Sequence, residues 1–361
     1  MTPRHVLMTV DAVGGVWRYA MDLCRALNDA RVRVLLVGLG PPPGTAQGAE
    51  AASLPGTRLQ WLDAPLDWMA PDAAALVGVP DELAALAARA GVDLLHLNLP
   101  SQAAGLRTER PVLIVSHSCL PSWWAAMRGT ALPAEWAWQW RLNAAGLARA
   151  EAVVAPSASH AAALRATYAP EGRIRVVPNA AAVTPGAGPR ELLVLAAARW
   201  WDEAKGGALL DEAAARSPWP VQAAGALRGD NGAAFTFHHA TALGPLPAED
   251  LRNRMRRAAV FASPSRYEPF GLAALEAAQA GAALVLAEIP TYREIWDGAA
   301  EFAADAGCLA AALHRLASDP ALLHRRAAQA RERAARFTPD RQLAALLAAY
   351  AAAAAAACPA E

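Results

Sequence analysis

Short apolar runs alternate with helical patterns along the whole chain. In the first half, runs rich in valine, isoleucine and leucine predict strands at residues 5–10, 32–38, 59–63, 92–97, 111–116, 152–157 and 173–178. In the second half, similar runs predict strands at residues 192–198, 221–227, 235–243, 259–265 and 282–288. Several of these runs are apolar throughout, as expected of strands covered on both faces. A loop or an amphipathic helix follows each run, and this alternation predicts repeated β-α-β units and parallel sheets.

The periodic pattern weakens once, near the middle of the chain. Residues 178–191, "PNAAAVTPGAGPRE", consist largely of proline, glycine and small residues, a composition typical of a connection between domains. We therefore predict an N-terminal domain over residues 1–180, a linker over 181–191 and a second domain over 192–340. Both would be doubly wound, and ligands in such sheets bind outside the carboxyl ends of the strands. We expect loops of both domains to form the site.

The two ends of the chain carry no clear membrane signal. An alanine-rich segment, Leu343 to Cys358, follows the helix start Thr338-Pro339-Asp340 and is shorter and less apolar than a membrane span. We expect a terminal helix over residues 341–361 that packs back toward the N-terminal domain. The first apolar run is too short for a signal peptide, and Asp11 interrupts it. These features favour a cytoplasmic protein with at most peripheral membrane contact.

Charge and cysteine content exclude some classes of partner. The sequence balances 33 basic against 33 acidic residues, so no net field attracts nucleic acid. The four cysteines have no metal-ligand spacing, which argues against a zinc site and a disulfide framework. They are Cys24, Cys119, Cys308 and Cys358.

The stretch "EPFGLAALEAAQAG", residues 268–281, contains two glutamates eight positions apart. Pro269 is favoured in a first helical turn, which would place Glu268 on a loop at the helix start and Glu276 about two turns into the helix. Backbone N–H groups at a helix start can bind a phosphate or a sugar hydroxyl. The groups in question belong to Phe270, Gly271 and Leu272. Taken alone, the spacing fits equally well a capping glutamate followed by a solvated one.

The surrounding sequence resembles a known family. "SRYEPFGLAALEAAQAG" is similar to the E-x7-E segment of retaining GT-B glycosyltransferases of the family 4 type, also called glycosyl transferases group 1. Other segments follow in the family's order: "DAVGGVWRYAMDLCRAL", "VSHS", "APSASHAAAL", "RIRVVPNA", "AAARWWDEAKGG" and "TALGPLPAEDLRNRMRRAAVFASPS". The resemblance covers nearly the whole chain. It implies two Rossmann-like domains facing a central cleft.

The resemblance also implies a reaction. A sugar would pass, with retention and without a metal or other cofactor, from a nucleotide-diphosphate sugar to a hydroxyl acceptor. UDP- and GDP-sugars are the expected donors, and a growing glycan, a lipid-linked sugar or a small molecule is the expected acceptor. No D-x-D pair, which the metal-dependent transferases of another fold use, occurs in the chain.

The resemblance assigns the donor contacts residue by residue. Arg199 and Lys205 would bind the phosphates, because the departing nucleotide gains negative charge that fixed cations stabilise. Glu268 would bind hydroxyls of the donor sugar, and Glu276 would accept hydrogen bonds from the ribose. Leu246 would line the pocket of the base through backbone contacts.

Three residues of the first half are further candidates. Gly14 and Gly15 form a tight turn before a helix and would bring backbone N–H groups close to a phosphate or an acceptor sugar; a structural turn is the alternative. His117 ends a predicted strand, and the resemblance places it near the donor sugar and the acceptor, where it can orient hydroxyls. A structural histidine is the alternative here too.

Several other residues are assigned weaker roles. His96 also ends a strand, and His238 and His239 are predicted to be structural strand residues. Five tryptophans could stack on an acceptor sugar, although tryptophans mostly pack in cores; they are Trp123, Trp124, Trp136, Trp138 and Trp140. A solvated helix face is predicted for the basic run Arg325, Arg326, Arg331, Arg333 and Arg336.

The chain departs from the family pattern in two places. "AAAV" follows Pro178-Asn179 where the family usually has glycine, and "IPTYREIWDG" replaces a glycine-rich loop while keeping Glu294. A GT-B epimerase or phosphorylase and a catalytically silent sugar-nucleotide-binding protein are the alternatives to a transferase.

Overall fold

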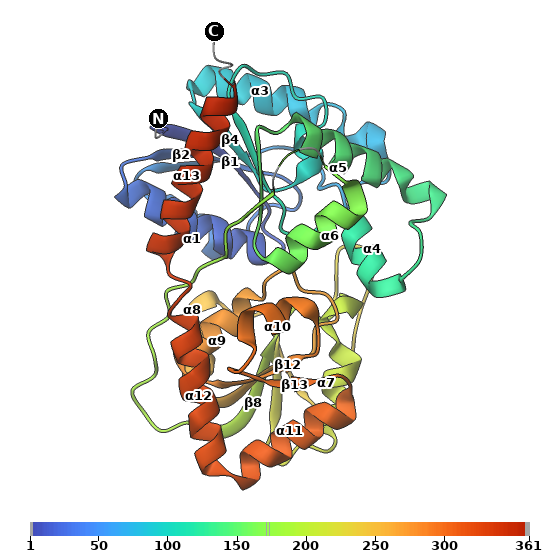
Figure 1. Ribbon diagram of the computed structural model, residues 1–361, viewed down its shortest axis with the longest axis vertical. Helices are drawn as coiled ribbons and strands as arrows, with labels where there is room; N and C mark the ends of the chain where they lie inside the picture. The colour runs from blue at the N-terminus through green and yellow to red at the C-terminus, as the bar shows by residue number, and fades with distance from the viewer. Residues whose placement is uncertain (1–2, 171, 173, 358–361) are drawn as a thin grey trace. The chain divides into compact units, whose positions relative to one another are not determined.

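The computed structural model describes residues 3–170, 172 and 174–357 (Figure 1). The chain divides into two compact units. Unit 1 contains the residues up to Asn179 and those from Pro339 onward, and unit 2 contains Ala180–Thr338. Arg173, which begins one predicted strand, and Cys358, which ends the predicted alanine-rich segment, lie outside the described residues.

Unit 1 has a parallel sheet of seven strands over the described residues. These are β1 (His5–Val10), β2 (Arg33–Gly38), β3 (Thr57–Trp61), β4 (Leu94–Leu97), β5 (Val112–Val115), β6 (Ala152–Ala155) and β7 (Ile174–Val176). Their order is β3-β2-β1-β4-β5-β6-β7, so the direction of winding changes between β1 and β4. Pairs such as Leu7 with Leu35 and Leu95 set the register.

Helices cover both faces of this sheet. They are α1 (Gly15–Asp29), α2 (Thr45–Ala52), α3 (Val79–Ala90), α4 (Leu120–Arg128), α5 (Ala137–Arg149), α6 (Ala158–Tyr168) and α13 (Pro339–Ala357). α3, α5 and α6 pack on the face that contains Leu7, Leu95 and Ile114. The terminal helix α13 lies along α1 and contacts β5 and β6 (Figure 1). Its Leu346 and Tyr350 side chains are fully buried.

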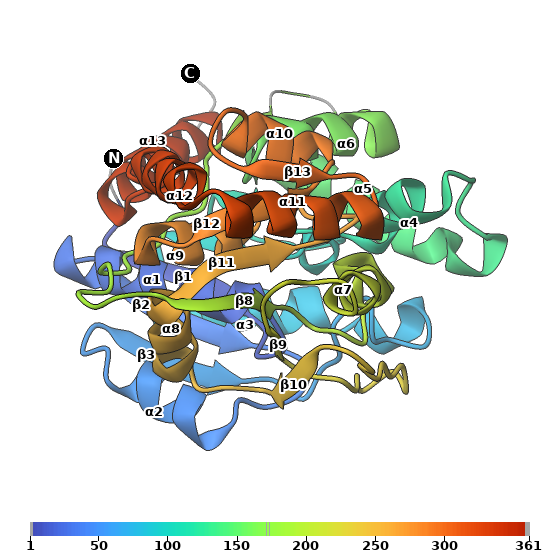
Figure 2. The same ribbon diagram turned by 90° about the horizontal axis from the view of Figure 1, so that it is seen from below.

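Unit 2 has a parallel sheet of six strands. These are β8 (Glu191–Ala197), β9 (Val221–Ala224), β10 (Thr241–Gly244), β11 (Ala258–Ser263), β12 (Ala283–Ala287) and β13 (Glu301–Ala303). The order β10-β9-β8-β11-β12-β13 can be followed across Figure 2. Winding therefore changes direction between β8 and β11.

The helices of unit 2 form two layers. They are α7 (Gly207–Ala214), α8 (Ala248–Arg257), α9 (Leu272–Ala280), α10 (Pro290–Trp296), α11 (Ala306–Ser318) and α12 (Pro320–Ala334). Leu193 and Leu195 of β8 pack with α8, α9 and α12, whereas Val194 and Ala196 pack with α7 and α11. Alternate residues of one strand thus contribute to two cores, which explains why the run is apolar throughout.

The predicted strands are present, with two differences. Residues 235–240 are not a strand, because the carboxylate of Asp211 on α7 accepts hydrogen bonds from the backbone N–H groups of His238, His239 and Ala240. The pairing of that segment therefore begins only at Thr241. β13 escaped prediction because it has only three residues. The prediction of two doubly wound domains is confirmed.

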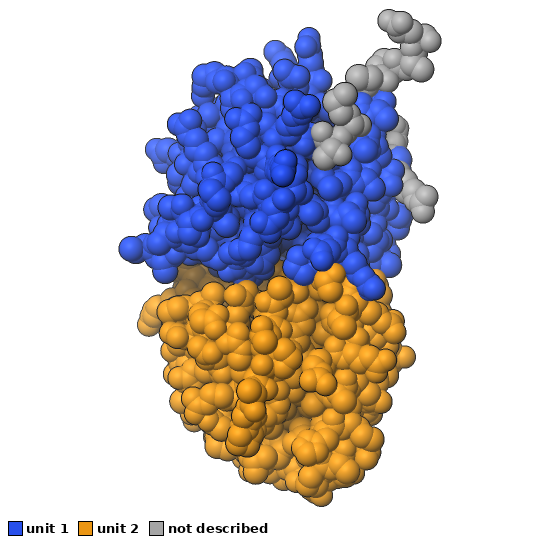
Figure 3. Space-filling view, turned by 90° about the vertical axis from the view of Figure 1, so that its left-hand side faces the viewer, with its two compact units in different colours: residues 1–179, 339–361 blue, residues 180–338 orange. Residues whose placement is uncertain are grey.

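The stretch predicted as a linker contributes to unit 2. Ala181 and Val183 are buried in the core of that unit, and the division between the units falls at Asn179 (Figure 3). Gln279 of α9 binds this stretch, donating to the carbonyl of Ala181 and accepting from the N–H of Val183. Among the described residues, no helix is long and apolar enough to cross a membrane.

Candidate functional site in unit 2 and a histidine cluster in unit 1

The carboxyl ends of β8 and β11 are neighbours at the point where the sheet of unit 2 changes direction. Parallel sheets bind ligands at such points. The loop after β8 carries Arg199 and Lys205, and the loop after β11 carries Glu268. The backbone N–H of Arg266 donates to the carbonyl oxygen of Ala204 at 2.7 Å. The two loops are therefore held together by their backbones.

Lys205 and Glu268 form an ion pair across these loops. The Nζ of Lys205 lies 2.8 Å from Oε2 of Glu268, and the side chains are 14% and 19% exposed. Lys205 ends a short 3-10 helix, Glu203–Lys205, which begins where the side chain of Asp202 accepts from the N–H of Ala204 at 3.0 Å. The structure thus brings together two residues predicted to contact the same donor.

Arg199 lies in the same loop but is not part of this pair. Its Nη2 is 3.5 Å from Oδ2 of Asp202, and its guanidinium lies over the ring of Trp201 at 5.3 Å from the centroid. With 34% of its side chain exposed, Arg199 is more accessible than Lys205. A guanidinium in this position can bind an anion through two N–H groups.

Glu276 has a partner that the sequence analysis missed. Arg252 of α8 binds Oε1 of Glu276 through Nη2 at 3.0 Å and through Nε at 3.3 Å. Glu276 is only 8% exposed. A carboxylate so close to full burial needs a partner of this kind, because isolated buried charges are costly.

The helix that carries Glu276 begins later than predicted. α9 starts at Leu272, and Pro269 lies in the preceding loop instead of the first helical turn. The reason is Gly271, whose φ of 93° turns the chain immediately before the helix. A Cβ at Gly271 would lie 2.7 Å from Cε1 of Tyr292. Glycine is therefore favoured at this position for two reasons: it adopts a positive φ without strain, and it needs no room for a Cβ.

Two other residues around this helix start, Phe270 and Tyr292, have structural contacts. The ring of Phe270 is buried in the core of unit 2 and meets Phe337 edge to face, so only its backbone can contribute to a site. Tyr292 donates or accepts a 2.6 Å hydrogen bond with Ser263. Burial and the nearby Glu268 carboxylate raise the pKa of Tyr292. Leu246 lies between β10 and α8, partly exposed.

In unit 1, His117 belongs to a buried hydrogen-bonded cluster. Its Nε2 lies 2.9 Å from Oδ1 of Asn98, the residue that follows β4. His96 approaches the same oxygen at 3.2 Å, and its Nδ1 lies 2.7 Å from the hydroxyl of Tyr350. The ring of Tyr19 meets His117 edge to face at 4.5 Å. His96 is therefore integrated into the same cluster as His117.

The histidines of this region are neutral at physiological pH. Burial lowers the pKa of His117 to about 3 and that of His96 to about 3. Burial likewise lowers the pKa of His160, on α6, to about 4. His117 retains partial exposure, whereas His96 and His160 are buried.

The glycine turn precedes α1 as predicted. Gly14 is the N-cap residue, and its carbonyl accepts from the N–H of Trp17 at 3.2 Å. Gly15 is the first residue of α1 and is exposed. Its role toward a ligand stays a prediction.

The weaker candidates have mostly structural contacts. Arg128 lies over the rings of both Trp123 and Trp124. Trp138 packs against the core of unit 1, Trp136 is partly buried, and Trp140 donates to the carbonyl of Thr167 at 2.9 Å. The prediction of a solvated basic face is wrong for two of the five arginines. Arg326 binds the buried Glu301, and Arg333 binds the carbonyls of Ile295 and Asp297.

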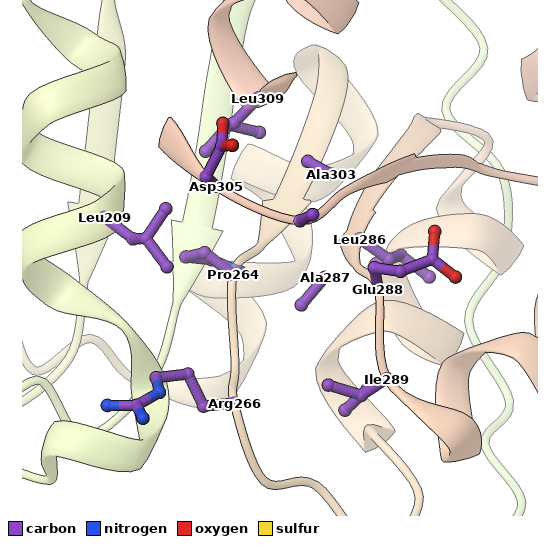
Figure 4. A pocket seen from close by; sticks show the side chains of 11 residues that line it. Leu209, Pro264, Arg266, Leu286, Ala287, Glu288, Ile289, Ala303, Asp305 and Leu309 are labelled. Atoms are coloured by element: carbon purple, nitrogen blue, oxygen red, sulfur yellow. The ribbon is translucent and has the colours of Figure 1, made fainter. Parts of the chain in front are cut away.

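A pocket of about 200 Å³ adjoins the loop after β11 (Figure 4). Its walls are largely apolar and include Leu209, Pro264, Leu286 and Leu309. The carboxylate of Glu288 is engaged by Arg293, and that of Asp305 accepts from the N–H of Cys308. Arg266 also lines the pocket, so the lining contains a cationic side chain that could bind an anionic ligand.

Two family models match the chain. Glycosyltransferase Family 4 matches residues 13–183, almost wholly in unit 1, and Glycosyl transferases group 1 matches residues 234–333, within unit 2. The chain belongs to the GT-B glycosyltransferases of the family 4 and group 1 type. The two doubly wound sheets are the two halves of that fold, and the recognition made from the sequence is confirmed.

Curated relatives of this family 4 chain match only in part. Glycogen synthase from two strains of Mycobacterium tuberculosis is 41% identical over 95 residues, which span 25% of this chain and 23% of the relative. The match therefore spans about a quarter of either protein.

Solved structures resemble the family 4 chain over nearly its full length. Sucrose-phosphate synthase from Thermosynechococcus elongatus has a TM-score of 0.77 at 19% identity, covering 95% of this chain and 97% of that one. Anabaena HepE, solved with UDP and glucose, has a TM-score of 0.73 at 17% identity, covering 96% and 99%. These similarities establish the shared fold.

One signal for the site was present in the sequence but was not used. Lys205 is the only lysine of the chain, although arginine is abundant. The one lysine of the chain is the residue whose ammonium contacts Glu268. Arg252 and Asn98 had no comparable signal. Among the described residues, no three His, Cys, Asp or Glu side chains form a group that could hold a metal ion.

Gly206 is expected to be essential for the position of Lys205. Its φ is 70°, and a Cβ there would lie 2.2 Å from the carbonyl oxygen of Pro264. We expect Gly206→Ala to destabilise the protein by about 2 to 4 kcal/mol, from backbone strain and the forced separation of the two loops. Urea denaturation would measure this loss. Gly232→Ala, also at positive φ but with open space around the Cβ, is the matched control, and equal losses in both variants would refute the role of the Pro264 contact.

Proposed function

We propose that this protein transfers a sugar, with retention and without a bound metal, from a nucleotide-diphosphate sugar to a hydroxyl acceptor. The observation that carries the proposal is the Lys205–Glu268 pair at the carboxyl ends of β8 and β11. A cation and a carboxylate side by side fit a donor that carries phosphate next to a sugar.

On binding, the phosphates of the donor would replace Glu268 as the partner of Lys205, and the sugar hydroxyls would replace Lys205 as the partner of Glu268. Lys205 and the more exposed Arg199 would bind the diphosphate and stabilise the charge that grows as the nucleotide departs. Backbone N–H groups at the start of α9 add a partial positive charge on the same side. Glu268 would accept hydroxyls of the sugar and stabilise positive charge that develops on its ring.

The ribose would be recognised by Glu276, about one turn into α9. Arg252 holds Glu276 and compensates its charge, so the carboxylate is already ordered before the donor arrives. Leu246, in the loop after β10, would contact the base through its backbone.

The base and the acceptor are proposed on weaker grounds. HepE is described as bound to UDP-glucose, which favours a UDP-sugar, with a GDP-sugar as the alternative. A growing glycan, a lipid-linked sugar or a small molecule would supply the hydroxyl. We propose that the reaction takes place in the cytoplasm, with at most peripheral membrane contact.

A donor panel tests the proposal. The purified chain would be incubated with UDP-glucose, UDP-N-acetylglucosamine, GDP-mannose and ADP-glucose, each with sugar acceptors, and nucleotide release and the anomeric configuration of the product would be measured with and without EDTA. We expect release from one donor that EDTA does not abolish, and a product with the donor's anomeric configuration. Glu268→Ala should lose the activity, whereas Glu332→Ala, exposed on α12, should keep it.

Each part of the proposal has its own contrary outcome. Release that requires a divalent metal would refute the metal-free step, and an inverted product would refute retention. Unchanged release in Glu268→Ala would refute the site. Phosphate-dependent glycan cleavage without transfer would indicate a phosphorylase instead.

A further inference from the structure

Asn98 lies at the centre of the polar cluster of unit 1. It is 2% exposed and follows β4, beside the carboxyl end of β1. Its Nδ2 donates to the carbonyl oxygen of Thr9 at 2.6 Å, and its backbone N–H donates to Oγ1 of Thr9 at 2.8 Å. The hydroxyl of Thr9 in turn donates to Oε1 of Gln102 at 2.7 Å. The side-chain amide is thus held against β1 by Thr9.

These contacts determine which end of the amide faces the histidines. A carbonyl oxygen can only accept a hydrogen bond. The NH2 end of Asn98 must therefore face Thr9, and the oxygen end must face Nε2 of His117 and Nε2 of His96, at 2.9 and 3.2 Å. In the reverse orientation the amide oxygen would face the carbonyl oxygen of Thr9, and neither atom could donate.

The oxygen of Asn98 then determines the tautomer of both rings. An amide oxygen cannot donate, so each Nε2 must carry a proton, and each Nδ1 of the neutral ring must be an acceptor. The surroundings of His96 are compatible with this assignment. Its Nδ1 lies 2.7 Å from the hydroxyl of Tyr350, which can donate to it. The network is consistent from β1 to the terminal helix.

We propose that Asn98 is a positioning residue that holds His117 in the Nε2–H tautomer, so that Nδ1 accepts a hydrogen bond from a sugar hydroxyl. The inference rests on the proposed function for the identity of the ligand, but the tautomer itself is a property of the free protein. Tyr19 supports the geometry, because its ring meets the His117 ring edge to face and restricts its rotation.

The environment of His117 keeps the ring neutral. The titratable groups around it come from four elements: His96 of β4, His160 of α6, Tyr19 of α1 and Tyr350 of α13. The two other histidines oppose a positive charge on His117 and add to the effect of burial. A neutral ring with a fixed proton on Nε2 can only accept at Nδ1.

The tautomer can be tested without any substrate. Long-range 1H–15N spectra of the full chain labelled at histidine, assigned with His117→Gln, report which ring nitrogen is protonated. We expect a protonated Nε2 and an unprotonated Nδ1 on His117 near pH 7. In Asn98→Asp, a carboxylate replaces the amide oxygen, and we expect His117 to titrate at least one pH unit higher than in the parent protein. Asn231→Asp, in a loop of unit 2, is the control and should leave His117 unchanged.

Two outcomes of these spectra would overturn the positioning role. They are a proton on Nδ1 in the parent protein, or a His117 titration that is the same in Asn98→Asp and in the parent. If Asn98→Asp does not fold, Asn98→Ser replaces it, and the proposal then requires a mixture of both His117 tautomers. A single Nε2–H tautomer in Asn98→Ser would overturn it.

The use of Nδ1 is tested by two substitutions that place an amide differently. His117→Asn puts an oxygen near the position of Nδ1, whereas His117→Gln puts its amide near the position of Nε2. With the donor identified by the panel, we expect His117→Asn to keep the rate of nucleotide release within about tenfold and His117→Gln to lose about a hundredfold. The opposite order, or equal losses, would overturn the acceptor role of Nδ1. If the parent protein releases no nucleotide from any donor, the proposed function fails while the spectra still decide the tautomer.

Discussion

Replacing Lys205 by methionine is expected to lower donor-dependent nucleotide release about 100- to 1,000-fold, the effect typical of removing one preorganised group that stabilises transition-state charge. Methionine keeps an unbranched apolar stem and removes the ammonium. Arg199 stays in place but lies toward Asp202 and Trp201, so it does not substitute for a charge beside Glu268. The loss should appear mainly in kcat, because the charge on the phosphates grows as the bond breaks.

The same substitution should have a smaller effect on stability. Glu268 would lose its partner in a site where the two side chains are 14% and 19% exposed. Because water still reaches the pair, we expect a loss of about 1 to 2 kcal/mol in the free energy of unfolding. A folded but inactive variant is therefore the expected result.

Two controls make the Lys205 experiment specific. Lys205→Arg keeps the charge and should retain part of the activity, and Arg325→Met removes an exposed cation of α12 and should retain all of it. Because Lys205 is the only lysine, reductive methylation with 13C-formaldehyde labels only its Nζ and the chain's α-amino group. Addition of the donor should shift the Nζ signal. A Lys205→Met variant with normal release would refute the assignment.

Acidification from pH 7 to pH 5 is expected to destabilise unit 1 by about 3 to 4 kcal/mol through His96 and His160. The partly exposed His117, whose pKa is also lowered, adds to this loss. Burial lowers the pKa of His96 to about 3 and that of His160 to about 4, against an ordinary value of 6.5. Since both folded-state values lie below the unfolded one, the unfolded chain binds more protons between pH 6.5 and about 4. Stability is therefore greatest above pH 6.5 and falls as the pH is lowered.

The structure explains why neither ring accepts a proton easily. Nε2 of His160 lies 3.0 Å from the hydroxyl of Ser116, and its buried Nδ1 has no hydrogen-bond partner among the described residues. A proton on that atom would be a buried charge without compensation. His96 is enclosed by Asn98, Tyr19 and Tyr350, of which none carries a negative charge near neutral pH.

Urea denaturation at pH 7.0, 6.0 and 5.0 measures the effect, followed by tryptophan fluorescence. The window stays above the range in which most carboxylates titrate, so the histidines dominate the slope. His160→Gln keeps a side chain that can bind Ser116 but does not titrate, and it should remove about 2 kcal/mol of the pH dependence. A variant with the full dependence would show that His160 does not contribute.

The strands and their order along the chain could be predicted from local pattern. β1, His5–Val10, was predicted with the bounds that the structure has, because the five apolar or β-branched residues that follow His5 lie between a polar start and a polar turn. The start of α9 was predicted too early. Proline is common in first helical turns, but here the positive φ of Gly271, where Tyr292 leaves no room for a Cβ, delays the helix start to Leu272.

Partners distant in sequence could not be predicted in this way. Glu268 pairs with Lys205, 63 residues away, and Arg252 binds Glu276 across 24 residues. Local periodicity contains no information on such pairs. The resemblance to a family predicted which residues belong to the site but not that they form ion pairs in the structure. Asn98 was missed for the same reason, because its role arises from Thr9 on a neighbouring strand.

If Lys205 and Glu268 bind the donor as proposed, their ion pair would also determine which molecules compete with it. A ligand that separates the pair must provide a new partner for each residue. A ligand that binds only one of them leaves the other charge unpaired. Inorganic phosphate could bind Lys205 but would bring negative charge next to Glu268. A free sugar could bind Glu268 but would leave Lys205 without an anion. A sugar nucleotide offers both replacements on one molecule. Under the proposed function, the ion pair would therefore discriminate against fragments of the donor.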